Sequence, residues 1–151
     1  MKYSSRKDTL KHIHMVRKFI FRIIWQLVKR ALFHDLSKLG KYEKDGFDIY
    51  TPKLKGLTYG SPAYKQCLQE LGVYLKHHYD NNSHHPEHYV IGINGMCLVD
   101  IVEMLCDWYA ATKRHNDGDI HKSIKLNKNR FNYSDELANI FECTVFRFLE
   151  K

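Results

Sequence analysis

Histidine and aspartate side chains gather in three segments of this 151-residue sequence. The first is HDLSK, residues 34–38, which follows the apolar run LVKRALF. The second, residues 77–88, holds five of the ten histidines, and the third is the acidic stretch DIVEMLCDW, residues 100–108. Imidazole and carboxylate groups bind divalent transition metals. Because an ionised carboxylate is costly to bury unless it is paired or coordinated, the pattern predicts a metal site that includes Asp35.

The three acids of the third segment share one side of a predicted helix. At 100° per residue, Asp100, Glu103 and Asp107 fall within about 60° of arc, beside the apolar face. Like charges this close destabilise an isolated helix, and a bound cation removes that cost. For this helix alone a solvated acidic face explains the pattern equally well. For the histidines, five within twelve positions favour coordination over a solvated loop.

The elements that must position these residues are predicted to be helices. No segment alternates like a strand, so we expect an all-α fold, a compact single-domain bundle of about five or six helices. The segment 39–62 is rich in glycine and proline and is predicted to be a long loop with about one turn of helix. NDGD at 116–119 should end a helix. The predicted helices span residues 8–33, 63–78, 94–114, a short one from about 120, and 134–149. Ser61-Pro62 should mark the start of the second and Ser134 the N-cap of the last.

The first helix raises a difficulty for two further histidines, His12 and His14. His12 precedes His34 by 22 residues, which is about 33 Å along a straight helix. Ligands of one metal cluster lie within a few ångströms of each other. Either the chain turns between residues 19 and 29, or the first histidine is not a ligand.

Composition limits the class of protein and its partners. The chain carries 24 basic and 17 acidic residues, net +7, a charge that suits an anionic partner but also a plain basic surface. Four cysteines without a CxxC pair indicate free, buried thiols in a reducing compartment. No apolar run approaches the roughly 20 residues that cross a bilayer, and the first residues lack the apolar stretch of a signal peptide. We expect a cytoplasmic protein without a membrane partner. It should form one domain over residues 1–151, of which residues 1–7 can be a disordered tail. The sequence does not determine the oligomeric state.

Taken together, these motifs resemble the HD superfamily of metal-dependent phosphohydrolases. HDLSK is similar to the HDxxK form of that family's doublet, and His78, His84 and His85 resemble the extra histidines of binuclear members, including the HD-GYP type. Over about residues 10–115, the order HDLSK, HH, HHPE and EMLCDW resembles a small HD-like family from bacteria and their phages. The GYP triplet is missing, so specificity for cyclic dinucleotides is not implied.

The resemblance implies an all-α fold of the HD type that binds one or two divalent ions (Mn, Fe, Co, Ni, Mg or Zn). It implies that His34, Asp35 and one of His12 or His14 bind metal, with an aspartate from the 100–107 helix, Asp107 being favoured over Asp100. The choice between His77 and His78 stays open. The full predicted ligand set is His14, His34, Asp35, His78, His84, His85 and Asp107.

The first functional hypothesis is hydrolysis of a phosphate ester, with a nucleotide as the expected substrate. Asp35, Lys38 and Glu103 are the candidate catalytic residues: Lys38 would meet a phosphate oxygen, and Glu103 would orient a histidine or act as general base. Lys113 and Arg114, with His115, would meet the far phosphate or sugar. The alternatives are a di-iron oxygenase of the HD fold and a basic helical protein that binds nucleic acid without catalysis.

Overall fold

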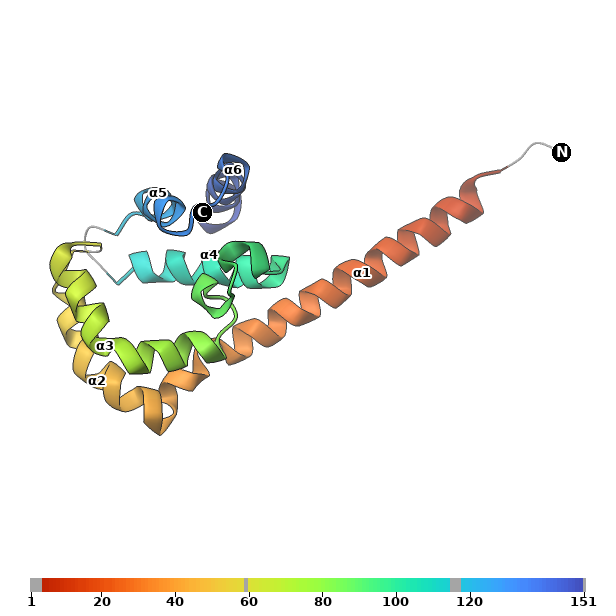
Figure 1. Ribbon diagram of the computed structural model, residues 1–151. Coiled ribbons are helices and arrows are strands. Elements are labelled where there is room, and N and C mark those ends of the chain that lie inside the picture. Colours follow the sequence, from red (N-terminus) through yellow and green to blue (C-terminus); the bar gives the residue numbers. More distant parts are fainter. Residues whose placement is uncertain (1–3, 59, 115–117, 151) are drawn as a thin grey trace. The chain divides into compact units, whose positions relative to one another are not determined.

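The computed structural model describes residues 4–58, 60–114 and 118–150 (Figure 1). Within these ranges the structure is helical and contains no strand, which confirms the all-α prediction. The chain divides into two compact units, Met1–His34 and Asp35–Lys151; its organisation as one domain stays a prediction. None of the described helices combines the length and the apolar character that a membrane crossing requires. The four cysteines are free, as predicted, but only Cys67 is buried; Cys97, Cys106 and Cys143 are exposed, which corrects that part of the prediction.

The first unit is one helix, α1 (Arg6–Phe33), and it settles the difficulty at the first histidines. Its 28 residues include no glycine or proline and form a continuous helix, so the chain does not turn between residues 19 and 29. His14 therefore lies about 30 Å along the axis from His34. The two histidines cannot coordinate the same ion, and the same holds for His12 and His34.

The expected loop over 39–62 is wrong, because most of this segment is helical. A short 3-10 helix, η1 (Leu36–Leu39), leads into α2 (Lys41–Lys55), with Pro52 in its last turn. Gly46 is a packing residue here: a Cβ atom at this position would lie 2.3 Å from Cγ of Tyr74 on the next helix. The glycine thus allows two helices to approach closely, a use that local sequence does not distinguish from flexibility. Tyr59, in the same predicted loop, lies outside the described residues.

The next helix, α3 (Pro62–Asn81), begins as predicted. Ser61 caps it, because its Oγ accepts a hydrogen bond from the Tyr64 backbone N–H at 3.1 Å, and Pro62 occupies the first turn. The helix bends at Gly72, whose backbone is not helical, and runs three residues past the predicted end. α2 and α3 lie side by side in Figure 1 and pack against each other. His78 lies on α3, and its partner Glu43 lies on α2, so the packing of these two helices positions His78.

The remaining helices hold the hydrophobic core. They are α4 (Leu98–Thr112), α5 (Ile120–Phe131) and α6 (Asp135–Thr144), followed by a π-helix, Val145–Leu149. α4 begins later than predicted because the 3-10 helix η3 (Gly92–Gly95) precedes it. Ser134 caps α6 as expected. Of the NDGD segment, residues 116 and 117 lie outside the described residues, and Asp119 caps α5. The core side chains are Ile93, Met104, Leu105, Ile120, Ile124, Tyr133, Phe141 and Val145.

Candidate metal centre

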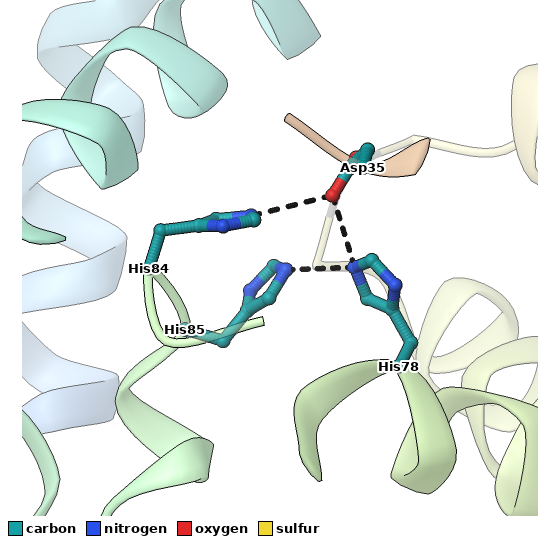
Figure 2. A group of neighbouring side chains, drawn as sticks. All are labelled: Asp35, His78, His84 and His85. Carbon is teal, nitrogen blue, oxygen red and sulfur yellow. Dashed lines mark hydrogen bonds and ion pairs between the residues drawn. The ribbon is translucent and has the colours of Figure 1, made fainter. Parts of the chain in front are cut away.

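Four potential metal ligands converge in the second unit: Asp35, His78, His84 and His85 (Figure 2). Asp35 directly precedes η1, His78 lies on α3, and the histidine pair lies in the connection from α3 to the 3-10 helix η2 (Pro86–His88). Each residue offers one ligand atom, and these atoms all lie within 4.8 Å of one another. The sequence placed these residues up to 50 positions apart, and the fold brings them into one cluster that could hold a metal ion.

The distances within the cluster match those between ligands of a single ion. His78 Nε2 lies 2.9 Å from His85 Nε2 and 3.3 Å from Asp35 Oδ1. His84 Nε2 lies 3.5 Å from the same Asp35 oxygen. Ligand atoms bound at about 2.0–2.1 Å are about 2.9 Å apart at a right angle and about 3.4 Å apart at the tetrahedral angle. Three of the distances in the cluster therefore fit one coordination shell, and the remaining pairs of ligand atoms lie within 4.8 Å of one another.

The backbone at Asp35 contributes to this arrangement. Its φ of 56° and ψ of 15° place it in the left-handed region, which aspartate and asparagine tolerate better than other residues with a Cβ atom. The residue is the N-cap of η1 and directs the chain into that short helix. Asp35 is thus held in the cluster by a conformation that few residue types adopt without strain.

A buried carboxylate, Glu43 on α2, orients His78. Glu43 is 1% exposed, and its Oε2 lies 2.9 Å from His78 Nδ1 while its Oε1 lies 2.7 Å from His77 Nδ1. A proton on Nδ1 of His78, donated to this carboxylate, would leave Nε2, which faces Asp35, free to bind a metal ion. Ser37 Oγ also donates to Glu43, at 3.0 Å. The geometry favours His78 over His77 as the predicted ligand, because His78 faces the cluster and His77 contacts Glu43 from its exposed side.

A second carboxylate, Glu103 on α4, has the same relation to His84. Glu103 is buried, and its Oε1 lies 3.3 Å from His84 Nδ1. His84 Nε2 is then the nitrogen that faces Asp35. Of the two predicted roles for Glu103, this contact corresponds to orienting a histidine. Two histidines of the cluster are therefore each held by a buried glutamate on the ring nitrogen opposite the site.

The protonation of the cluster favours cation binding. Burial and the neighbouring His84 and His78 lower the pKa of His85 to about 3, so its imidazole is neutral at neutral pH. Burial acts to raise the pKa of Asp35, but the contacts of its carboxylate with His78 and with the ammonium group of Lys38 outweigh burial and hold that pKa well below its usual range. Lys38 Nζ lies 2.6 Å from Asp35 Oδ2. Neutral imidazoles and an ionised carboxylate are the forms that bind metal.

The two candidate aspartates of α4 have different environments. A carboxylate oxygen of Asp107 lies within 4.8 Å of one of Asp35, and Asp107 lines the same cavity as His78 and His85. Asp100 is instead engaged at the start of α4. Its carboxylate accepts hydrogen bonds from Cys97 N, Ser83 Oγ and Tyr89 OH at 3.0, 2.8 and 2.9 Å. The geometry agrees with the preference for Asp107.

The remaining predicted site residues are placed as follows. His34 is the last residue of the first unit, and its role as a ligand stays a prediction. Lys113 ends α4 with its Nζ over the Tyr109 ring, 4.2 Å from the centroid. Arg114 lines the cavity beside the cluster. His115 lies outside the described residues.

A cavity of about 290 Å³ opens beside the metal cluster. His78, His85 and Asp107 line it at the cluster. Its other lining side chains include four cations and several aromatic rings, so it is suited to an anionic ligand with a flat part. The cations are Lys38, Lys55, Arg114 and Arg130, and the rings include Phe47, Tyr64, Tyr79, Trp108 and Phe131.

Sequence analysis missed Glu43, Arg130 and the residues of α2 that line the cavity. Glu43 falls in the segment predicted to be a loop, where a carboxylate gives no sign of burial. One signal was available: the paired histidines at 77 and 78 require an acceptor for their ring N–H groups, and an unassigned acid was the natural candidate. Arg130 carries no local signal, because it is one of many basic residues and reaches the cavity only through the packing of α5.

Comparison with known proteins places the chain in a family of unknown function, DUF5662, whose model matches residues 1–150. The chain belongs to this family. No curated protein and no solved structure gives a significant match.

Proposed function

We propose that this protein is a metal-dependent phosphohydrolase that cleaves a small phosphate ester, with nucleotides as the expected substrates. One observation carries the proposal: a cluster of four potential metal ligands lies at the edge of a cavity that is rich in cations. A bound cation next to fixed Lys and Arg side chains is the arrangement that phosphoryl transfer requires. The likeness of HDLSK and the paired histidines to HD phosphohydrolases points in the same direction.

The residues that would hold the ion are Asp35, His78, His84 and His85, with Asp107 beside them and His34 as a further predicted ligand. A divalent ion in such a site lowers the pKa of a bound water and polarises a phosphoryl oxygen. The roles of the protein are to keep the histidines in the right tautomer and to bind the substrate. Glu43 and Glu103 perform the first role, through His78 and His84.

The cations of the cavity perform the second role. Arg114 makes no ion pair with any described residue, so its guanidinium is available to bind phosphate oxygens in a bidentate manner. Lys38 is paired with Asp35 and lies 5.1 Å from the centroid of the Phe47 ring. A phosphate that binds near Asp35 can share this ammonium group, which is the predicted role of Lys38.

The metal content of purified protein tests the proposal. We expect nearly stoichiometric manganese, iron, cobalt or nickel in the wild type, measured by elemental mass spectrometry, and loss of this metal in Asp35→Asn and in His84→Ala. Asparagine is chosen because it tolerates the left-handed backbone at position 35. His88→Ala is the matched control, because His88 ends the neighbouring helix η2, is exposed, and directs its Nδ1 to the Tyr79 carbonyl rather than to the cluster. Absence of metal after reconstitution, or full occupancy in both site variants, would refute the proposal.

Activity assays then separate the chemical alternatives. We expect the metal-loaded wild type to release phosphate from nucleotides or from p-nitrophenyl phosphate, and Asp35→Asn to be inactive. The donor set of three imidazoles and a carboxylate also suits iron. Oxygen consumption without phosphate release would therefore favour the di-iron oxygenase. Binding of DNA or RNA that is steeply salt-dependent and insensitive to a chelator would favour the non-enzymatic alternative.

A further inference from the structure

A second cavity, of about 280 Å³, lies beyond the metal centre between the C-terminal end of α4 and α5. Its lining is mixed: apolar or aromatic side chains lie beside three hydroxyl groups, of Thr58, Thr112 and Ser123, and beside one ion pair, Lys122 with Asp119. Neither a predicted metal ligand nor an arginine lines it. Its lining residues include Tyr64, Trp108, Ala111, Thr58, Ser123 and Leu126. The chemistry of this cavity therefore differs from that of the cavity at the metal cluster.

The two cavities are neighbours, because Tyr64, Trp108 and Ala111 line both of them. Each is slightly smaller than the roughly 300 Å³ of the smallest usual ligand sites, and together they fall within the usual range of about 300–1,000 Å³. A single ligand that extends past Trp108 would occupy both. Its anionic end would lie among the cations, and its uncharged end in the second cavity.

Trp108, which the two cavities share, is held by the aromatic core. Its ring is nearly parallel to the ring of Phe131, with an interplanar angle of 5° and centroids 6.2 Å apart. Phe141 contacts it edge-on at 5.8 Å. A tryptophan fixed in this way offers a preorganised surface for stacking, which is worth about 1–3 kcal/mol per nucleic acid base in other proteins.

The polar groups of the second cavity suit a heteroaromatic ring better than a purely hydrocarbon one. Thr58 and the buried Ser123 contribute hydroxyl groups, which can donate to or accept from the edge of a ring. Asp119 adds a carboxylate, although it is already engaged as the cap of α5. A hydrocarbon group would make no hydrogen bond with the Thr58 hydroxyl and none with the remaining capacity of Ser123, whose Oγ already accepts a bond from Asn127 Nδ2 at 3.3 Å.

We propose that the second cavity binds the nucleobase of the substrate, so that the substrate is a nucleoside monophosphate with its phosphate at the metal cluster. This inference rests on the proposed function for the phosphate, but the binding of the base can be measured without catalysis. It assigns Trp108 and Leu126 to substrate binding. Trp108 directly follows the candidate ligand Asp107, so one turn of α4 would contact both ends of the substrate.

Calorimetric titration of metal-loaded and chelator-treated protein tests the inference. The probes are the four common nucleoside 5′-monophosphates, their nucleosides, and inorganic phosphate. Leu126→Trp partly fills the second cavity alone, and Lys125→Trp on the exposed side of α5 is the matched control. We expect Leu126→Trp to weaken binding of at least one nucleoside monophosphate by about tenfold or more, the size of a lost base stacking contact. Leu126→Trp should leave the metal content and the affinity for inorganic phosphate unchanged. Lys125→Trp should change neither of these nor the affinity for nucleoside monophosphates.

The possible failures are distinguishable. Metal and phosphate binding without any preference for a nucleotide over phosphate would overturn the inference and leave the proposed phosphohydrolase intact. Equal nucleotide affinity in wild type and Leu126→Trp would also overturn it. Nucleoside binding that Leu126→Trp abolishes, in a protein that binds no metal, would support the base site and refute the hydrolytic function.

Discussion

Replacing Glu43 with glutamine removes a charge that two histidines share. The carboxylate presents Oε1 to His77 and Oε2 to His78, at 2.7 and 2.9 Å. A glutamine amide has one oxygen and one NH2 group, so only one of the two rings keeps an acceptor. If the NH2 group faces His78, that ring must carry its proton on Nε2, where the proton blocks metal binding. We expect the metal dissociation constant to rise about 10–100-fold, or about 1.4–2.7 kcal/mol, the usual effect of losing such a partner.

The assay is titration of the metal-free protein with Co²⁺ or Mn²⁺ in competition with a chromogenic chelator. Glu70→Gln is the matched control, because Glu70 is an exposed residue of α3 whose carboxylate accepts a hydrogen bond from Gln66 Nε2. Far-UV circular dichroism and thermal unfolding would confirm that Glu43→Gln folds. A dissociation constant within twofold of the wild type would refute the assignment of Glu43 as the group that orients His78.

A double variant makes the test sharper. In Glu43→Gln with His77→Ala, the competing ring is gone, so the amide oxygen is free to accept from His78. We expect this double variant to bind metal more tightly than Glu43→Gln alone, a non-additive result that a purely structural role for Glu43 would not give. A double variant weaker than or equal to Glu43→Gln would contradict the tautomer argument.

Two further predictions concern the packing and capping of the second unit. Gly46→Ala should lower the free energy of unfolding, measured in urea, by about 1–3 kcal/mol, because its Cβ would overlap the Tyr74 ring. Gly56→Ala is the control, because the nearest atom to its new Cβ lies 3.7 Å away. Asp100→Asn should lower the free energy of unfolding by about 1.5–3 kcal/mol near neutral pH, through weaker hydrogen bonds at the start of α4. Burial raises the pKa of Asp100, but the hydrogen bonds it accepts outweigh this and lower the pKa to about 2, from an ordinary 3.8. The ionised Asp100 carboxylate therefore stabilises the fold above about pH 4, and this stabilisation is lost as the pH falls toward 2. The difference in free energy of unfolding between wild type and Asp100→Asn should shrink over that interval. A difference that does not change with pH would contradict this prediction.

Some features of this protein were predictable from local sequence. The spacing of apolar residues predicts α1, and the motif Ser61-Pro62 and Ser134 mark helix starts that the structure confirms. These features depend on residues within one or two turns of each other, which is the range over which helix capping and periodicity act. The types of the potential ligands were equally visible, because aspartate beside clustered histidines has few other uses near a core.

Tertiary structure alone decided which members of each pair face the cluster. His77 and His78 are neighbours with the same chemistry, and only the packing of α2 against α3 turns His78 inward onto Asp35. Asp100 and Asp107 share a helix face, yet Asp100 caps α4 while Asp107 lines the cavity. Gly46 is a further example: α2 packs closely against α3 at this glycine, and a glycine needed for such packing cannot be told from a flexible one by local sequence. The sequence by itself determined an all-α chain with a set of candidate ligands, and the non-local packing of helices selected among them, because burial and orientation depend on contacts between residues far apart in the chain.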